Sequence, residues 1–261
     1  PHQRRAVVGH RQHGEGPAGQ EQFDRDPVMG QRVLHRADDG GLVIAPTGDL
    51  DSHPVAKRRK FSVRRGDDGG PERLDIDRFD PYCHHLIVRD TEQDRIIACT
   101  RLLTCEAALQ AGGFYSAGEF EMSAIAALPD RKVEVGRTCV DAEFRSGAII
   151  SKLWQGLTAF VSNHNYRYLF GCASIGLDDG GAQASAILDK IERRYLAAET
   201  LHVAPRRPYP VQRPAAEIAM RMPPLLKAYV SLGAKACGAP YWDQSFNCCD
   251  VLMLLDIDEL A

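Results

Sequence analysis

The chain has 261 residues, a length that suits one large domain or two small ones. Its 32 lysines and arginines nearly balance 35 aspartates and glutamates, so the charge argues against a nucleic-acid or polyanion binder. No apolar run approaches the roughly 20 residues of a membrane span, and the first residues contain no apolar signal core. We therefore expect a cytoplasmic protein without a nucleic-acid partner.

The eight cysteines form neither a C-x-x-C pair nor a cysteine and histidine group with zinc spacing. Most lie in apolar runs such as LFGCASI and IIACTRLL, where cysteine behaves as a small hydrophobic residue. We expect reduced thiols in the core and no metal site.

The composition changes near residue 70. Residues 1–70 contain five of the nine histidines and no Tyr or Trp, so this segment has little material for a core. Apart from GLVIA at 41–45, which suits a short strand, it lacks strand or helix periodicity. We expect 1–70 to be an irregular leader, disordered or aberrant in sequence, and 71–261 to form the folded domain.

Apolar runs beyond Asp75 predict the strands of an α/β domain. In chain order they cover 83–90, 95–103, 133–140, 166–175 and 248–258. The first two are joined by the turn TEQD and read as a hairpin. The fifth closes the domain.

Three helices are predicted among these strands. Apolar residues from Ile149 to Val161 recur at helical spacing, and a second apolar face runs from Ala184 to Tyr195. Pro223 and Pro224 suit the start of a third helix, where a missing N–H costs nothing. Since the first helix connects the strands at 133–140 and 166–175, we expect those two strands to be parallel.

The strand VEVGRTCV carries two opposite charges, Glu134 and Arg137, and a helix start follows it. Arg145, Ser146, Gly147 and Ala148 would present unpaired N–H groups and one guanidinium without a bulky side chain at 147 or 148. That is an anion-binding arrangement next to a parallel sheet edge, where α/β proteins bind ligands. A simple tight turn explains the same residues equally well.

Several spaced motifs resemble one family. Glu-x-x-Arg in VEVGRTCV, DRFD at 77–80 and the arginine of CTRLL resemble the acyl-homoserine-lactone synthase branch of the GNAT superfamily. GFYSAGEFEMS, YRYLFGCASI, PPLLKAYVSLGAKACG and FNCCDVLMLLDIDEL are more similar to its relatives, the ornithine N-acyltransferases that make lyso-ornithine lipid. The resemblance covers about 72–261 and implies a GNAT-like α/β fold, with a central mixed sheet flanked by helices.

The resemblance also implies an activity. We expect transfer of a 3-hydroxy fatty acyl group from acyl carrier protein to the α-amine of ornithine. No separate cofactor is expected, because the phosphopantetheine arm arrives on the carrier protein, with its phosphate at Arg145–Ala148. A peripheral contact with the inner membrane face would suit an enzyme that makes an amphiphile. Alternatives are an N-acyl-amino-acid or acyl-homoserine-lactone synthase, and a non-catalytic acyl-binding homologue.

The reaction needs a proton acceptor, because an α-amine with a pKa near 8 is mostly protonated at neutral pH. Glu134 is the candidate general base, acting directly or through water. By resemblance, N–H groups between Arg137 and Val140 would stabilise the oxyanion.

Each remaining candidate has a structural alternative. Arg101 and Arg137 either hold the acceptor's carboxylate or form buried ion pairs, for example with Glu134. Asp77 and Asp80 either bind the acceptor's ammonium groups or cap a turn. Phe120 corresponds to an aromatic residue that lines the acyl site in the lactone synthases, but a single aromatic is more often part of the core.

Overall fold

The computed structural model describes eight parts of the chain. They are 23–25, 32–35, 42–46, 77–90, 93, 95–145, 147–211 and 219–259, with only the backbone described in the first three. Most of the leader predicted for 1–70 thus lies outside the described residues, and its irregular character stays a prediction. The predicted strand at 41–45 corresponds to β3, Leu42–Pro46.

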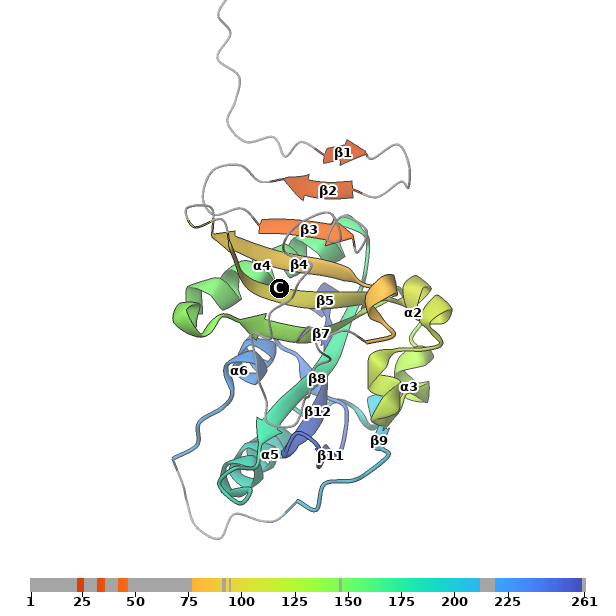
Figure 1. Cartoon of the computed structure of the whole chain (residues 1–261). Coiled ribbons are helices and arrows are strands. Elements are labelled where there is room, and N and C mark those ends of the chain that lie inside the picture. Colours follow the sequence, from red (N-terminus) through yellow and green to blue (C-terminus); the bar gives the residue numbers. More distant parts are fainter. Residues whose placement is uncertain are drawn as a thin grey trace, which may run out of the picture.

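One mixed sheet of ten strands dominates the described structure (Figure 1). Its order is β1-β2-β3-β4-β5-β7-β8-β12-β10, with β11 paired to β12. Besides β3, these strands are β1 (Phe23–Arg25), β2 (Arg32–His35), β4 (His84–Asp90), β5 (Arg95–Thr104), β7 (Lys132–Val140), β8 (Tyr168–Gly176), β10 (Lys235–Ala236), β11 (Tyr241–Asp243) and β12 (Cys248–Asp256). A second sheet pairs β6 (Phe120–Glu121) with β9 (Ala204–Pro205).

The pairing confirms the predicted topology. β4 and β5 form the expected antiparallel hairpin, and β7 and β8 are the expected parallel pair, joined by α4 (Gly147–Asn163). The other neighbours in the order are antiparallel. The sheet is therefore mixed, with its one parallel pair at the centre of the described fold.

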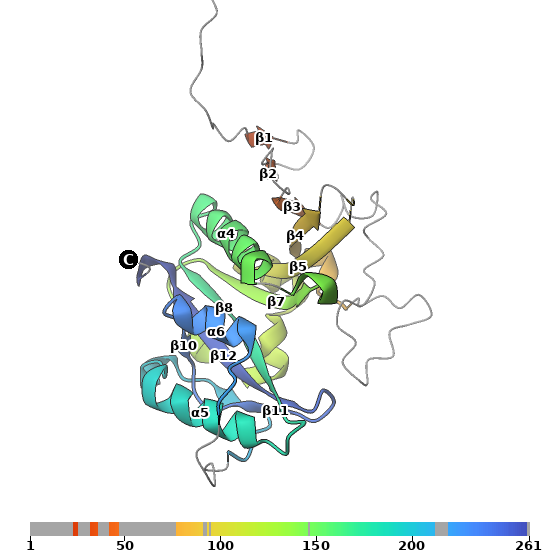
Figure 2. The same ribbon diagram turned by 90° about the vertical axis from the view of Figure 1, so that its left-hand side faces the viewer.

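Helices cover both faces of the sheet (Figure 2). On one face, α4, α5 (Ala182–Arg194) and α6 (Pro224–Ser231) bury the main apolar cluster against alternate strand residues such as Val133 and Val135. On the other face lie α2, α3 and η2. Their bounds, with those of the other short helices, are η1 (Asp80–Tyr82), α2 (Cys105–Ala111), η2 (Tyr115–Gly118), α3 (Ser123–Ala126), η3 (Ala142–Phe144), η4 (Glu199–Leu201) and η5 (Ile257–Glu259).

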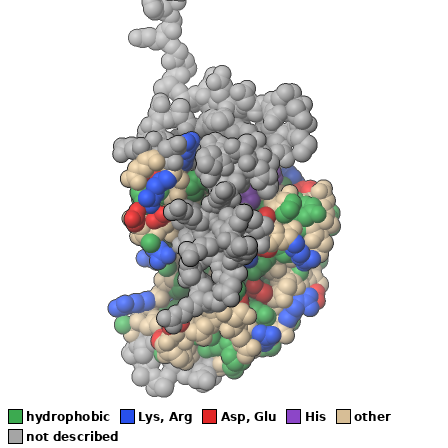
Figure 3. All heavy atoms as spheres, viewed as in Figure 1, with side chains coloured by type: hydrophobic (Ala, Val, Ile, Leu, Met, Phe, Trp, Pro, Cys, Tyr) green, Lys and Arg blue, Asp and Glu red, His purple; other side chains and the backbone are tan. Residues whose placement is uncertain are grey.

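All eight cysteines are free thiols, and five of them are buried, as the apolar sequence context predicts. Within the described residues no helix is both long and apolar enough to cross a bilayer. On the face shown in Figure 3, acidic and basic side chains are interspersed among the others.

Candidate functional site

The central feature of the site is that β7 and β8 separate. Their parallel ladder pairs Lys132–Glu134 with Tyr168–Phe170, but β7 continues to Val140 and β8 to Gly176. Residues 135–140 and 171–176 thus run on without pairing to each other. We call this region the strand split. The edges of β7 and β8 that no longer face each other can there face a ligand.

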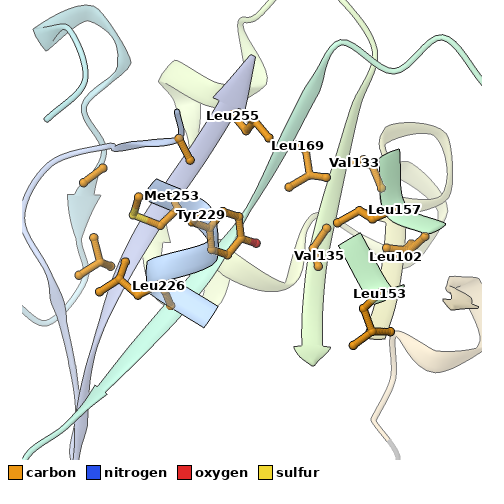
Figure 4. Packing of buried hydrophobic residues seen from close by; sticks show 14 of the residues in the cluster. Leu102, Val133, Val135, Leu153, Leu157, Leu169, Leu226, Tyr229, Met253 and Leu255 are labelled. Atoms are coloured by element: carbon orange, nitrogen blue, oxygen red, sulfur yellow. The ribbon is translucent and has the colours of Figure 1, made fainter. Parts of the chain in front are cut away.

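Gly171 lies where the ladder ends. A Cβ at this position would lie 2.2 Å from the Val135 carbonyl oxygen and 3.0 Å from the hydroxyl of Tyr229, so only glycine fits. Figure 4 shows the Tyr229 side chain between Met253 and Val135, with its hydroxyl directed toward β7. Burial raises the pKa of this phenol, which is therefore neutral at ordinary pH.

A β-bulge follows in β7. Cys99 pairs with Cys139 and Arg101 with Gly136, so Arg137 and Thr138 together oppose Thr100. Arg137 has a φ of 51°, in the left-handed region that costs a non-glycine residue about 1 kcal/mol. The Thr100 hydroxyl lies 2.7 Å from that of Thr138 and donates to the Gly136 carbonyl, which satisfies polar groups that the bulge removes from the ladder.

The predicted charged residues of three separate segments meet beside this bulge. Arg101 Nη1 donates to Asp77 at 2.7 Å and lies 3.4 Å from Asp80, while Arg137 Nη2 lies 3.3 Å from Asp77. In the turn that leads into η1, the Asp80 carboxylate also accepts the Asp77 N–H, and the Asp77 carboxylate accepts the Phe79 N–H. The turn-capping interpretation and the ion-pair interpretation are thus both realised in one cluster.

Tyr115 of η2 packs against both arginines. The guanidinium carbons of Arg101 and Arg137 each lie 5.6 Å from the centroid of its ring, within range of a cation–π interaction. The backbone of η2 also binds Glu134, so this short helix connects the charged cluster to the strand split.

Both carboxylate oxygens of Glu134 accept hydrogen bonds from η2. The Tyr115 N–H donates to Oε2 at 2.7 Å, and the Ser116 N–H and hydroxyl donate to Oε1 at 2.7 and 2.5 Å. Burial of this side chain raises the pKa of Glu134, and the bonds from Ser116 and Tyr115 and the charge of Arg101 oppose that rise. Glu134 is therefore a carboxylate with an increased affinity for a proton.

A second carboxylate, Glu119, lies on the β8 side of the same region. The Cys172 thiol donates to Glu119 at 3.3 Å, and the Cys172 sulfur is also 3.3 Å from the Ser116 hydroxyl oxygen. Burial raises the pKa of Glu119 to about 8, and the negative charges of Asp250, Asp243 and Glu134 add to the rise. Glu119 therefore exchanges its proton near neutral pH.

The raised pKa of Glu119 predicts a pH-dependent stability. The folded state holds this proton more tightly than the unfolded state, whose carboxyl has a pKa near 4.5. The contribution of Glu119 to the stability of the folded state is therefore complete below pH 4.5. It is lost as the pH rises toward about 8. We expect Glu119→Gln to raise the melting temperature relative to wild type at pH 8.5 and to leave it nearly unchanged at pH 4.5. An equal shift at both pH values would contradict this assignment.

The predicted anion-binding residues lie at the start of α4. Arg145, Gly147 and Ala148 are exposed, whereas Ser146 lies outside the described residues. A Cβ on Gly147 would meet no atom within 4 Å beyond its chain neighbours and the backbone of its own helix. The position suits an anion at a helix N-terminus, but binding there stays a prediction.

Phe120 and a small pocket mark the apolar surroundings. Phe120 is fully buried among aromatic and aliphatic residues, with its ring centroid 6.1 Å from that of Tyr241. On the opposite face a pocket of about 20 Å³, room for about one water molecule, lies between β7 and the helices. It is lined by Thr100, Val135, Thr138, Ile150, Leu153, Trp154, Leu157 and Leu225.

Three potential metal ligands approach one another among the described residues. Oxygen and sulfur atoms of Asp243, Cys248 and Asp250 lie within 4.8 Å of each other. Asp243 already accepts the N–H groups of Ser245 and Phe246, and the Cys248 thiol donates to Asp250. Hydrogen bonding accounts for the grouping.

Sequence reasoning did not identify Tyr115, Ser116, Glu119, Cys172 or Tyr229 as site residues. A four-residue 3₁₀ helix such as η2 has no periodic signature, and Tyr229 reads simply as an apolar helix position. The motif GFYSAGEFEMS, which contains three of the five, was the available signal.

The chain is similar to several known proteins. Residues 59–155 match the family model described as an acetyltransferase (GNAT) domain. A CoA-dependent acyl-homoserine lactone synthase of known structure is 12% identical, with a TM-score of 0.43, over 81% of this chain and 74% of its own.

Curated relatives are more similar in sequence. The L-ornithine N(alpha)-acyltransferase of Rhodobacter capsulatus is 33% identical over 72% of this chain and 77% of its own length. The enzyme of the same name from Brucella abortus is 33% identical over 73% of each chain. With this identity over most of both lengths, the chain belongs to the L-ornithine N(alpha)-acyltransferase family of GNAT-type acyltransferases.

Proposed function

We propose that this acyltransferase moves a 3-hydroxy fatty acyl group from acyl carrier protein to the α-amine of ornithine, giving lyso-ornithine lipid. The observation that carries the proposal is the separation of β7 and β8 beside the buried carboxylate of Glu134. A thioester seated in the strand split would lie between a proton acceptor on one strand and a neutral phenol, Tyr229, near the other.

The donor would bind along the split with its phosphate at the start of α4. Arg145 and the N–H groups near Gly147 and Ala148 supply positive charge and hydrogen-bond donors for the phosphopantetheine arm. The arm is part of the carrier protein, so no separate cofactor is required. Lys152 on the same helix adds a positive charge suited to an acidic carrier surface.

The chemistry would proceed by nucleophilic addition and loss of the thiol. Glu134 accepts the proton that the amine loses, and N–H groups of β7 between Arg137 and Val140 stabilise the oxyanion. Tyr229 would protonate the sulfur that leaves; its protonated hydroxyl beside Gly171 supports this role. Positioning and electrostatics supply most of the rate in this scheme.

The acceptor would bind at the cluster of Asp77, Asp80, Arg101 and Arg137. Opposite charges within one cluster suit an amino acid, whose carboxylate and ammonium groups can exchange with the existing ion pairs. Phe120 lies in the apolar cluster under η2 and is proposed to contact the acyl chain.

A peripheral contact with the inner membrane face is also proposed, because the product is an amphiphile. Leu109 on α2 is 85% exposed and Tyr82 on the neighbouring η1 is 38% exposed. Two large apolar side chains on adjacent elements support a contact with lipid.

Gly147→Val is expected to weaken binding of the donor more than binding of the acceptor. The open space around Gly147 accommodates the side chain in the free protein, but the branched group blocks the approach of a phosphate to the helix N–H groups. The measurement is KM for acyl carrier protein and for ornithine, with the melting temperature as a control for folding. Equal increases in both values would argue against a phosphate site here.

The proposed function is tested by incubating the purified chain with 3-hydroxyacyl carrier protein and a panel of amino acids, and weighing the lipid products. Acyl-ornithine as the main product supports the proposal. Acylation of other amino acids in preference to ornithine would indicate an N-acyl-amino-acid synthase. A lactone product that requires S-adenosylmethionine would indicate a lactone synthase. Binding of the acyl group without any product would indicate a non-catalytic homologue.

A further inference from the structure

Both carboxylate oxygens of Glu134 are occupied in the observed arrangement. They accept hydrogen bonds from η2, where Ser116 (1% exposed) is buried together with Glu134 (3% exposed). A direct role as a base would require one of these bonds to break, so that an oxygen is released toward the substrate. The hydroxyl of Ser116 offers another route, since it already donates its proton to Oε1 of Glu134 at 2.5 Å.

Ser116 lies between the two strands that separate. Its oxygen contacts Glu134 on β7 and is 3.3 Å from the sulfur of Cys172 on β8. Glu134 is the last β7 residue in the parallel ladder, whereas Cys172 lies two residues beyond Phe170, its last partner in β8. The hydroxyl thus bridges the strands at the closed end of the strand split, next to the proposed position of the reacting thioester.

The backbone holds Ser116 in this position. The N–H groups of Tyr115 and Ser116 both bind Glu134, so the carboxylate fixes the first turn of η2 as well as the hydroxyl. The Tyr115 ring, packed against Arg101 and Arg137, anchors the same turn from the other side. A hydroxyl held by this many contacts has its orientation set before a substrate arrives.

We propose that Ser116 is a catalytic residue that relays the proton of the acceptor amine to Glu134. This inference rests on the proposed function. As the amine nitrogen bonds to the thioester carbon, the nitrogen's proton passes to the Ser116 oxygen, and the hydroxyl's own proton passes to Oε1 of Glu134. The carbon–sulfur bond then breaks, and the leaving sulfur takes the hydroxyl proton of Tyr229. Glu134 releases the proton it gained to solvent and Tyr229 regains one, which restores both groups. The neutral amine loses one hydrogen and the thiol gains one, so protons balance over the cycle.

The surrounding charges support Glu134 as the final acceptor. Its burial favours the protonated form and so increases its affinity for a proton, and the η2 donors and Arg101 oppose that preference. Glu119 is the competing acceptor, because it contacts Cys172 on the other side of Ser116. The experiment must therefore separate a relay to Glu134 from direct transfer to Glu119.

The test is a double-mutant cycle on acyl-ornithine formation by the full chain. The variants are Ser116→Ala, Glu134→Gln and the two combined, with Ser116→Thr as the variant that keeps a hydroxyl. Ser185→Ala is the matched control, since Ser185 is also buried and its hydroxyl bonds to a backbone carbonyl on α5. Glu119→Gln is measured in parallel, and melting temperatures are recorded for every variant.

A relay predicts that Ser116→Ala lowers kcat about 100-fold, in the range of general acid–base catalysis. The kcat of the double variant would then lie within about threefold of that of the slower single variant, because both changes break the same proton path. Ser116→Thr would recover at least about tenfold over Ser116→Ala, and the Ser185→Ala control would keep wild-type kcat. We expect kcat/KM to fall with kcat while KM for ornithine changes little.

Three results would overturn the relay. They are a kcat for Ser116→Ala within about threefold of wild type, multiplicative losses in the double variant, or a loss of about 100-fold in Glu119→Gln with none in Ser116→Ala. In each case the wild-type chain still makes acyl-ornithine, so the proposed function survives. A wild-type chain that makes no acyl-ornithine would remove both the proposed function and the relay.

Discussion

Glu134→Gln is expected to lower the turnover of acyl-ornithine formation at least about tenfold while the chain stays folded. Glutamine keeps the size of the side chain and one carbonyl oxygen, which suffices for the two Ser116 donors that share Oε1. Its amide NH₂ would face the Tyr115 N–H in place of Oε2, a mismatch that costs about 1–3 kcal/mol. The proton acceptor is lost, whereas the fold is only weakened.

Single-turnover kinetics and a thermal melt measure the two effects of Glu134→Gln separately. Glu121→Gln is the control, since Glu121 is exposed on β6, close by in the sequence, and lies 3.9 Å from Arg206. We expect the control to match wild type in both measurements. Normal turnover in Glu134→Gln, together with a normal melting temperature, would remove Glu134 from the mechanism.

Gly171→Ala is expected to give a large loss of stability and to abolish activity. Its Cβ would lie 2.2 Å from the Val135 carbonyl oxygen, a backbone atom that moves only with β7. Overpacking of a buried site costs about 1–3 kcal/mol, and contact with a backbone atom places this substitution at the upper end. Relief of the contact would shift β7 relative to β8 and displace Tyr229, which changes the shape of the strand split.

Urea denaturation of Gly171→Ala and Gly136→Ala compares two glycines on adjacent strands of the sheet, one buried with no room for a Cβ and one partly buried with room for it. A Cβ at Gly136 meets no atom within 4 Å, so Gly136→Ala is expected to change the free energy of unfolding by less than about 1 kcal/mol. If Gly171→Ala were as stable as Gly136→Ala, the close approach of β7 and β8 at the end of their ladder would be wrong.

The regular elements of the fold were predictable because their periodicity is long. Apolar spacing between Ile149 and Val161 predicts a helix, and α4 covers that range with two residues more at each end. Since this helix connects two apolar runs, the parallel pair follows from topology alone. The resemblance implies that Asp77, Asp80, Arg101 and Arg137 serve one acceptor, but the sequence alone does not predict their contacts. The fold brings the four residues together.

The details of the site depend on features that leave no periodic signal. The apolar alternation of β7 continues past Glu134, so the end of its ladder with β8 cannot be read from VEVGRTCV. The left-handed backbone at Arg137 is set by the bulge opposite Thr100 and not by residue type. The partners of Glu134 come from η2, whose four residues are too few for a pattern. The sequence allows an ion pair between Glu134 and Arg137, whereas in the structure Arg137 forms an ion pair with Asp77.

The central claim is that the strand split and its charged cluster direct one acyl group to the α-amine of ornithine. Tandem mass spectrometry of the product from 3-hydroxyacyl carrier protein tests it directly, with ornithine and Nα-acetylornithine as separate acceptors. The account predicts a single acyl group on the α-nitrogen of ornithine and no product from the blocked acceptor. Acylation of the δ-nitrogen, or equal product from Nα-acetylornithine, would contradict it.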